Sequence, residues 1–277
     1  MIHTSMQLKA KIRNMSGGDS TKSSILLRNF VMERFLERVA LSPYRNNFVL
    51  KGGMLVAAVV GLDTRATMDI DTTIKSLTLT SENAEKVIND IIAIEVPDGM
   101  EFKISRFSDI MEGHDYPGIR FMLETKLDNM RQIIKIDIST GDIITPKAVE
   151  YSYKLMFEDR SISIWTYNLE TLIGEKLETI MARGITNTRM RDFYDIHVLL
   201  HEKELDYSVL KDAFMATSRK RGSEHLLPDF DEILDSVHLD SNMKDMWEKF
   251  RSDNFFVGDI SWDDVNQSVL KLKNNVF

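Results

Sequence analysis

The sequence predicts an α+β region of strands and helices up to about residue 167, followed by an all-helical region. Between residues 48 and 140, several segments alternate apolar and polar residues, the pattern of a strand with one buried face. From residue 168 onward, apolar residues recur at helical spacing instead. Because 277 residues can hold two modest domains, we predict domains at residues 1–167 and 168–277.

Each element follows from its local pattern and its boundary residues. Short apolar or alternating runs between turn residues predict strands at 48–50, 67–74, 101–107, 119–127, 132–140 and 162–165. Helical spacing predicts helices at 21–39, 54–60, 81–95, 168–183, 188–201, 207–219, 229–237, 242–250 and 262–272. Asn168 and Thr188 are expected to be the N-caps of the helices that they open.

Composition excludes several classes of protein. The sequence has no cysteine, which rules out disulfides, zinc ribbons and thiol catalysis. It has no apolar run long enough for a membrane helix and no secretory signal at its start, so we expect a cytoplasmic protein. The net charge of −8 argues against a general nucleic-acid coat. Residues 1–51 nevertheless hold nine Lys and Arg against three Asp and Glu, and this basic arm either contacts a phosphate backbone or is a solvated helix face.

The segment from residue 51 to residue 75 carries the clearest chemical signal. Asp69 and Asp71 are two residues apart in a predicted strand, so both side chains project from one face, about 6 to 7 Å apart. Two carboxylates this close repel each other unless a cation lies between them, and carboxylate oxygens suit Mg²⁺ with bound phosphate. Gly52 and Gly53 upstream allow the backbone to approach a polyphosphate. The segment therefore has the outline of a phosphoryl- or nucleotidyl-transfer site.

A third carboxylate lies in the predicted strand at 132–140. Asp137 stands between Ile136 and Ile138, so it points to the face opposite the two isoleucines, and it shares that face with Lys135 and Ser139. By itself the pattern fits an ordinary half-exposed strand. Together with the upstream pair it favours a metal ligand, because three carboxylates on adjacent strands can hold two Mg²⁺ ions for an in-line displacement.

Four motifs in order resemble the nucleotidyltransferase toxins of the AbiEii and MenT family, within the DNA polymerase β-like superfamily. The motifs are KGGMLV with TRATMDID, then KIDIS, then LIGEKLETIMAR, then RMRDFYDIHVLL. They cover about residues 51 to 200. The resemblance implies a nucleotidyltransferase-like first domain with a mixed sheet flanked by helices. It also implies that the helical second domain contributes to the nucleotide site.

The resemblance also implies roles for individual residues. Gly52 and Gly53 match the glycine motif that begins the helix facing the triphosphate; many relatives have Gly-Ser there, and Thr64 or Thr67 is a candidate for the missing hydroxyl. The metal-binding carboxylates would be Asp69, Asp71 and Asp137, and Asp137 is a candidate base for the acceptor hydroxyl. The resemblance makes Lys176 the lysine that binds the triphosphate, and Arg183 shares its helix face. Without the resemblance, Lys176 would be interpreted as a surface charge.

Further polar residues leave alternatives open. Asp192 and Asp195 match the fourth motif with Arg191, and either complete the nucleotide site or form an ion-pair network that orients Lys176. Arg65 either contacts the incoming phosphate or pairs with Asp63. Residues 218–221 are a basic patch that either complements a helix dipole or grips an RNA backbone. A zinc site at the two histidines 197 and 201 is not expected, because no third ligand is evident.

The resemblance implies a Mg²⁺-dependent nucleotidyltransferase, the toxin half of a toxin–antitoxin or phage-defence pair. It would transfer a nucleoside monophosphate from an NTP to RNA, with tRNA as the expected acceptor, and a cognate antitoxin is the expected partner. Two alternatives remain. One is an enzyme that transfers a phosphate or a nucleotide to a protein or small molecule; the other is a non-catalytic protein that binds NTP or RNA. The intact set of mutually repelling carboxylates argues against the second.

Overall fold

The computed structural model describes residues 1–78, 80–110 and 118–277. It divides into two compact units. The first comprises residues 1–58, 66–142 and 149–166, and the second comprises residues 59–65, 143–148 and 167–277. The chain thus passes from one unit to the other several times. The two domains predicted from the sequence, 1–167 and 168–277, stay a prediction.

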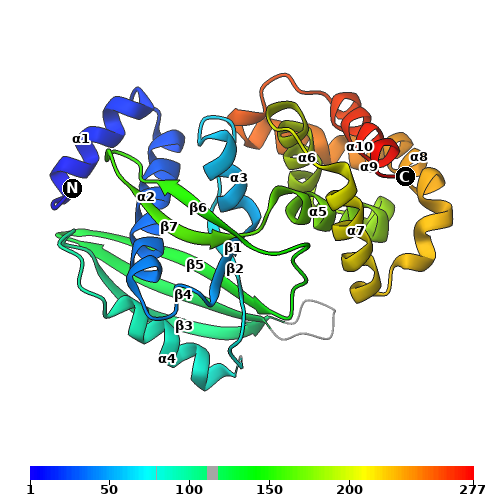
Figure 1. Cartoon of the computed structure of the whole chain (residues 1–277). Helices are drawn as coiled ribbons and strands as arrows, with labels where there is room; N and C mark the ends of the chain where they lie inside the picture. The colour runs from blue at the N-terminus through cyan, green and yellow to red at the C-terminus, as the bar shows by residue number, and fades with distance from the viewer. Residues whose placement is uncertain (79, 111–117) are drawn as a thin grey trace. The chain divides into compact units, whose positions relative to one another are not determined.

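Within the described residues, the first unit is built on a mixed sheet of seven strands (Figure 1). The strands are β1 (Phe48–Lys51), β2 (Asp69–Ile74), β3 (Glu101–Ile110), β4 (Gly118–Leu127), β5 (Met130–Thr140), β6 (Val149–Lys154) and β7 (Ser161–Thr166). Their order across the sheet is β3-β4-β5-β2-β1-β7-β6. β2 is parallel to β5 and antiparallel to β1, which places it near the middle of the sheet.

In the described part of the chain, the helices that accompany the sheet are α1 (Ser5–Ser16), α2 (Ser20–Leu41), α3 (Gly52–Val60) and α4 (Ser81–Ile92). Helix α2 packs against β5, β7 and α4, and α4 also packs along β3 (Figure 1). Apolar side chains such as Phe30, Phe35 and Phe121 are fully buried in this core. The predicted α+β class with a mixed, helix-flanked sheet is therefore confirmed.

Helix α2 also buries charge, which its sequence pattern did not predict. Glu33, Arg34, Glu37 and Arg38 are each at most 4 % exposed. Arg38 forms a bidentate ion pair with Asp98 at 2.8 and 2.9 Å. Buried charges need such partners, because desolvating an isolated ion in the core would cost on the order of several kcal/mol. The partners lie far away in the chain, so periodicity alone cannot reveal them.

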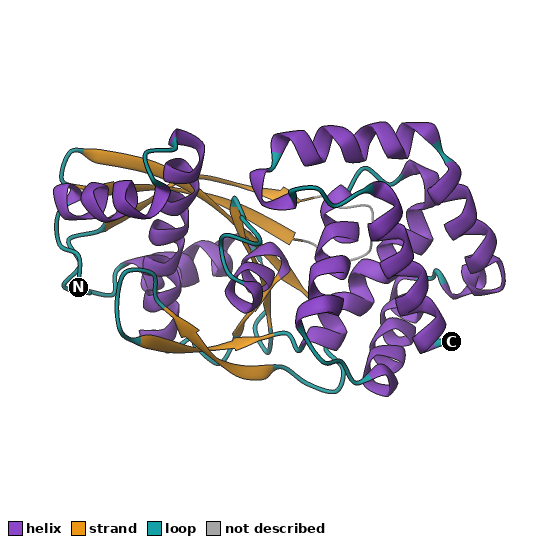
Figure 2. Ribbon diagram, turned by 90° about the horizontal axis from the view of Figure 1, so that it is seen from above, coloured by secondary structure: helices purple, strands orange, loops and turns teal. Residues whose placement is uncertain are grey.

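The second unit is helical in all of its described secondary structure (Figure 2). Its α-helices are α5 (Leu169–Arg183), α6 (Met190–Glu202), α7 (Tyr207–Arg221), α8 (Phe230–Leu239), α9 (Ser241–Asp253) and α10 (Trp262–Val276), with short 3₁₀ turns η1 (Gly184–Thr186), η2 (Glu224–Asp229) and η3 (Phe255–Val257). Trp247, Trp262 and Phe193 are at the centre of its core. The predicted all-helical region is confirmed. Among the helices that the structure describes, each is too short or too polar to cross a lipid bilayer.

Local signals explain most of the helix and strand boundaries. Asn168 is the N-cap of α5, as predicted, and its Oδ1 accepts a hydrogen bond from the Thr171 N–H at 2.7 Å. The prediction for Thr188 was wrong: α6 begins at Met190, and Arg189 is its N-cap without a side-chain hydrogen bond. Neither α1 nor β6 was predicted, because both are largely exposed and carry few apolar residues.

Candidate active site

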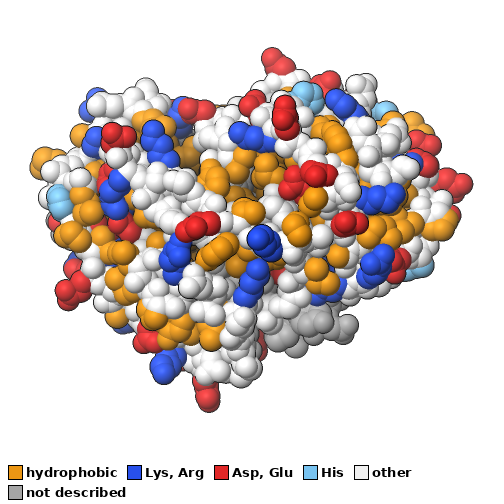
Figure 3. All heavy atoms as spheres, in the orientation of Figure 1, with side chains coloured by type: hydrophobic (Ala, Val, Ile, Leu, Met, Phe, Trp, Pro, Cys, Tyr) orange, Lys and Arg blue, Asp and Glu red, His pale blue; other side chains and the backbone are white. Residues whose placement is uncertain are grey.

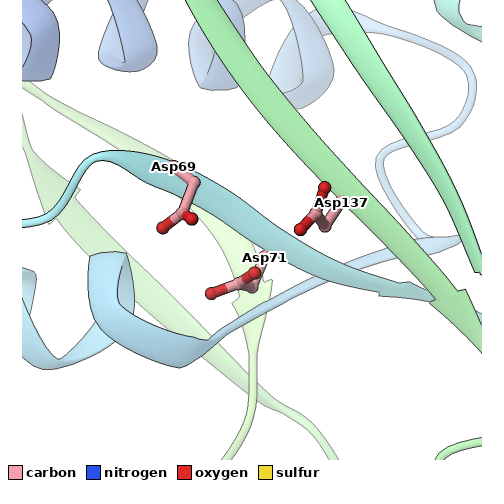
Figure 4. Close-up of side chains that lie close together, drawn as sticks. All are labelled: Asp69, Asp71 and Asp137. Carbon is pink, nitrogen blue, oxygen red and sulfur yellow. The ribbon is translucent and has the colours of Figure 1, made fainter. Parts of the chain in front are cut away.

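Asp69, Asp71 and Asp137 come together on the sheet of the first unit. Asp71 and Asp137 are direct register partners on the parallel strands β2 and β5, and Asp69 is two residues before Asp71. One carboxylate oxygen of each residue lies within 4.8 Å of the corresponding oxygens of the other two. Figure 4 shows the three side chains gathered on one side of the two strands. Alternation sends the buried Ile70 and Ile136 to the opposite face.

Gly52 makes room for the central carboxylate. It directly follows β1 and begins α3, with φ +62°, in the left-handed region that favours glycine. A Cβ atom at this position would lie 2.2 Å from Oδ2 of Asp71, which is far inside van der Waals contact. Gly53 follows as a buried residue in the first turn of α3. A glycine at position 52 therefore leaves the space that the Asp71 side chain occupies.

Two cations contact the carboxylates directly. Lys135 Nζ lies 2.5 Å from Asp69 and 3.6 Å from Asp137. Arg120, on β4, donates two hydrogen bonds to Asp137, from Nε at 2.8 Å and from Nη2 at 2.7 Å. The position of Lys135 followed from strand alternation. The position of Arg120 did not, because it depends on the pairing of β4 with β5.

A second pair of charges lies next to the site. Lys51 Nζ lies 2.5 Å from Asp142, whose carboxylate also accepts a hydrogen bond from the Ser139 hydroxyl at 2.6 Å. Lys51 is the register partner of Asp71 on β1, so its charge acts on that carboxylate as well. Sequence reasoning missed Asp142, since only the fold brings it to Lys51.

The electrostatics of Asp71 differ from those of an ordinary surface carboxyl. Burial raises its pKa to about 6, and the negative charges of Asp69 and Asp137 add to this effect. Lys51 and Lys135 act in the opposite direction. A cation bound among the three carboxylates would favour the ionised form of Asp71. The site is thus arranged to accept positive charge.

Thr67 is placed beside Asp69. Its side chain is buried, and its hydroxyl lies 3.3 Å from the Asp69 carbonyl oxygen and 3.4 Å from Asp69 Oδ1, donating toward both. In this position the hydroxyl orients Asp69. The predicted alternative, in which Thr67 replaces a phosphate-binding serine of the relatives, would require the hydroxyl to turn away from Asp69.

Lys176, Asp192 and Asp195 form a compact network in the second unit. Lys176 Nζ lies 2.8 Å from Asp192 Oδ1 and 2.8 Å from Asp195 Oδ2. Burial acts to lower the pKa of Lys176, but the two carboxylates outweigh it and the pKa is raised. Lys176 thus lies between two carboxylates that favour its charged form. Whether Asp192 and Asp195 also complete the nucleotide site stays a prediction.

Arg65 completes this network from the loop before β2. It is 2 % exposed, and its Nε donates to Asp195 Oδ1 at 2.5 Å. The nearby Tyr194 hydroxyl donates to the carbonyl oxygens of Thr64 (2.5 Å) and Phe256 (3.0 Å). Arg65 and Asp195 are both buried and pair with each other, which joins the loop before β2 to α6. Their predicted contact with the nucleotide stays a prediction.

Other predicted candidates also have partners. In the basic patch at 218–221, Arg219 pairs with Glu224 at 2.9 Å, and Arg221 pairs with Glu178 at 2.5 Å. The pairing favours the structural interpretation of this patch over RNA binding. His197 faces the Ser268 hydroxyl at 2.8 Å, and among the described residues neither His197 nor His201 belongs to a cluster that could hold a metal ion.

The mixed sheet, the paired aspartates of β2 and the third aspartate of β5 define a nucleotidyltransferase-like fold and site. The family model of the AbiEii nucleotidyl transferase toxins of type IV toxin–antitoxin systems matches residues 34–267. The chain therefore belongs to the AbiEii family, and it is a nucleotidyltransferase toxin by that membership. The sequence-based recognition of the family is confirmed.

Several solved structures match the chain. JHP933 from Helicobacter pylori shares 18 % sequence identity, with 91 % of this chain and 93 % of that chain covered and a TM-score of 0.50. An antigenic nucleotidyltransferase-like protein from Paracoccidioides brasiliensis shares 16 % identity, with 84 % and 94 % covered and a TM-score of 0.39. The first supports a shared fold and no more at this identity, and the second is too dissimilar to support an argument. No curated protein matched the chain.

Proposed function

We propose that this toxin is a Mg²⁺-dependent enzyme that transfers a nucleoside monophosphate from an NTP to RNA, with tRNA as the acceptor and pyrophosphate as the leaving group. The observation that carries the proposal is the cluster of Asp69, Asp71 and Asp137 in a member of a nucleotidyltransferase family. Three carboxylates this close repel one another, and a divalent cation bound among them would remove that repulsion.

The residues present fit a hard divalent cation. All three candidate ligands are carboxylates, whose oxygens Mg²⁺ prefers. When bound, one or two such ions would activate the acceptor hydroxyl and neutralise the triphosphate. Lys135 and Arg120 supply part of the positive charge that the carboxylates require.

Individual residues of the chain would then have separate roles in binding and proton transfer. Asp137 is the candidate base that takes the proton of the acceptor hydroxyl, and the bidentate contact with Arg120 fixes its orientation. Gly52 admits Asp71 and opens α3, whose N-terminal N–H groups suit phosphate oxygens. The permanent positive charge of Lys176 supports its assignment to the triphosphate. Asp192 would hold Lys176 in place.

Membership of a type IV toxin–antitoxin family implies an NTP substrate and an antitoxin. We propose that the antitoxin counteracts this chain in the cell where both are made. Induced expression should stop growth for the wild type and not for Asp71→Asn. Growth arrest by both proteins at equal abundance would mean that toxicity does not depend on the carboxylate site.

A transfer assay tests the proposal directly. The purified protein is incubated with total bacterial RNA, Mg²⁺ and each NTP in turn, labelled at the α-phosphate. Wild type should label a tRNA-sized band with at least one NTP, and Asp71→Asn should label none. Labelling of RNA by Asp71→Asn at the rate of the wild type would contradict the proposal.

The same assay separates the two alternatives. A γ-phosphate label that moves to the acceptor would establish a phosphotransferase. Label in protein or in a small molecule would change the acceptor class. Metal-dependent NTP binding without product in any fraction would establish a binding protein in place of an enzyme.

A further inference from the structure

Helix α1 has an unusual charge distribution. It carries Lys9, Lys11 and Arg13 and no carboxylate, in a chain whose net charge is −8. All three side chains are exposed, while Leu8 and Ile12 are buried where the helix packs on α2. Within residues 1–78, 80–110 and 118–277, none of the three side chains has an ion-pair or hydrogen-bond partner. Some other cations of the unit, such as Arg38 and Arg120, are bound to carboxylates, while α4 and β3 also carry exposed cations without such a partner in the described part of the chain.

A further cation lies beside the candidate active site, on the helix against which α1 packs. Arg28, on α2, is half-buried and donates from Nη1 to the Met68 sulfur at 3.2 Å. Its Nε is buried and has no hydrogen-bond partner among the described atoms. Met68 directly precedes Asp69, so Arg28 lies beside the start of β2. A guanidinium that faces a thioether, with no carboxylate as partner, keeps its charge available for an anion.

These cations lie on two consecutive helices of one unit. Helix α2 follows α1 after a short turn, and the two helices pack together. In the view of Figure 3, Lys and Arg side chains are visible over this part of the molecule, with some acidic side chains among them. We call Lys9, Lys11, Arg13 and Arg28 the α1–α2 basic surface. Cations spread over two helices suit an anion that extends over several phosphates.

We propose that the α1–α2 basic surface binds the phosphate backbone of the acceptor RNA. This inference rests on the proposed function, and it assigns recognition of the acceptor RNA to a particular surface of the protein. Unpaired, exposed cations neutralise phosphates and release the counterions that surround the nucleic acid, which favours binding at low salt. Arg28 lies at the end of the surface next to Asp69, where the reacting end of the RNA would enter.

The chain offers a closely matched control for a charge test. The test variant is Lys9→Gln with Lys11→Gln and Arg13→Gln. The control is Lys86→Gln with Lys103→Gln and Arg106→Gln, which also removes two lysines and one arginine. The control residues are exposed on α4 and β3 of the same unit, and like the α1 residues they have no side-chain partner in the described part of the chain. Both variants change the net charge equally. A difference between their affinities for RNA therefore depends on where the charges lie in the protein.

Binding is measured by fluorescence anisotropy with fluorescein-labelled tRNA between about 50 and 200 mM salt, the range over which phosphate contacts are resolved. The α1 variant should raise Kd about tenfold at the lower salt and reduce the slope of log Kd against log salt by about 2, since each single-strand contact contributes about 0.7. The α4–β3 variant should leave the slope unchanged. Equal effects of the two variants, or no effect of either, would overturn the inference.

Arg28→Gln provides an independent measurement. It should raise the KM for tRNA and leave the KM for NTP unchanged, because the surface contacts the acceptor and not the nucleotide. A raised KM for NTP alone would contradict the assignment. Loss of neutralisation by the antitoxin in the α1 variant, with unchanged tRNA binding, would also overturn it, since the surface would then be a protein-binding site.

The outcome can be separated from failure of the proposed function. If the wild type labels no RNA with any NTP, the proposed function fails. If the wild type labels RNA and the α1 variant does so with the same KM for RNA, the transfer activity stands and the basic surface alone is refuted.

Discussion

Gly52 and Asp71 share a space that holds only one of two atoms: a Cβ on residue 52, or the Asp71 carboxylate oxygen that would lie 2.2 Å from it. The glycine that opens α3 and the aspartate at the centre of β2 are therefore a matched pair. The position of Asp71 thus requires a glycine at residue 52, whether or not this residue also faces a phosphate.

The first prediction follows from this pair. Gly52→Ala should reduce kcat/KM by about 100-fold, because a displacement of about 1 Å at a reacting group has effects of that size. The control is Gly17→Ala, since Gly17 has nearly the same φ, +61°, and an alanine Cβ there would meet no atom within 4 Å beyond its neighbours in the chain. Both variants should lose about 1 to 2 kcal/mol of stability from backbone strain, and Gly52→Ala should lose more, because its Cβ would also displace the Asp71 side chain. Equal activity of the two variants would show that Asp71 does not need the space.

The second prediction concerns Asp195. Its carboxylate is completely buried between Arg65 and Lys176, so Asp195→Asn should reduce the free energy of unfolding by about 3 to 5 kcal/mol. Asp192→Asn removes a single contact of Lys176 and should cost about 1 to 2 kcal/mol. Urea unfolding measures both. Equal, small losses would mean that the network does not stabilise the helical unit.

The pH dependence of this effect has a definite sign. Burial acts to raise the pKa of Asp195, but Arg65 and Lys176 outweigh it, and the pKa is lowered. The stabilisation is therefore fully present above the pKa of the unfolded chain and is lost as pH falls through the folded value. Asp195→Asn should accordingly lose less stability than wild type between neutral and acidic pH.

The third prediction uses the buried charge of α2. Glu33 accepts hydrogen bonds from Asn29 and from the Met156 N–H, each at 2.9 Å, and burial raises its pKa to about 8 from 4.5. Arg34 also pairs with Glu37 and Glu158. An ionised Glu33 would therefore share the charge of Arg34 with two other carboxylates.

The sign for Glu33 is opposite to that for Asp195. The folded state holds a proton between pH 4.5 and about 8 that the unfolded state has lost, so stability falls as pH rises through this window. The slope is about 1.4 kcal/mol per pH unit for one proton. Glu33→Gln cannot titrate, so the difference between wild type and variant, from urea unfolding at several pH values, should show this slope. A difference in unfolding free energy between wild type and Glu33→Gln that does not change with pH would contradict the prediction.

The fourth prediction links Asp71 to metal binding. Because its pKa is raised to about 6 before a cation binds, protons compete with the metal at lower pH. The Kd for Mn²⁺, used as a spectroscopic probe, should rise about tenfold per pH unit below 6 and level off above it. Asp71→Asn should bind weakly at every pH. A Kd that does not change with pH below 6 would show that Asp71 is not a ligand.

Much of the fold was predictable because it depends on local patterns. Alternation defined the strands that carry Asp71 and Asp137, and the capping of α5 by Asn168 marked the start of the helical region. The helix α1 was missed, since only three of its residues are buried. A mostly polar helix that depends on its neighbour for stability has no strong pattern of its own.

The candidate site was predictable in part for the same reason. Asp69 and Asp71 are two residues apart on one strand, so their shared face follows from geometry. Arg120 and Asp142 reach the site through strand pairing and a turn, which the sequence does not encode locally. The ion pair of Arg65 with Asp195 depends on the position of α6, which the sequence does not encode locally either.

The most direct test of nucleotidyl transfer is the mass of the tRNA after reaction. Wild-type protein, Mg²⁺ and the accepted NTP are incubated with one tRNA, and its 3′-terminal fragment is analysed by mass spectrometry. We expect this fragment to gain whole nucleoside monophosphate residues with the wild type, and to stay unchanged with Asp71→Asn. A fragment of unchanged mass after reaction with the wild type, or one that gains only a phosphate, would contradict nucleotidyl transfer to RNA by this site.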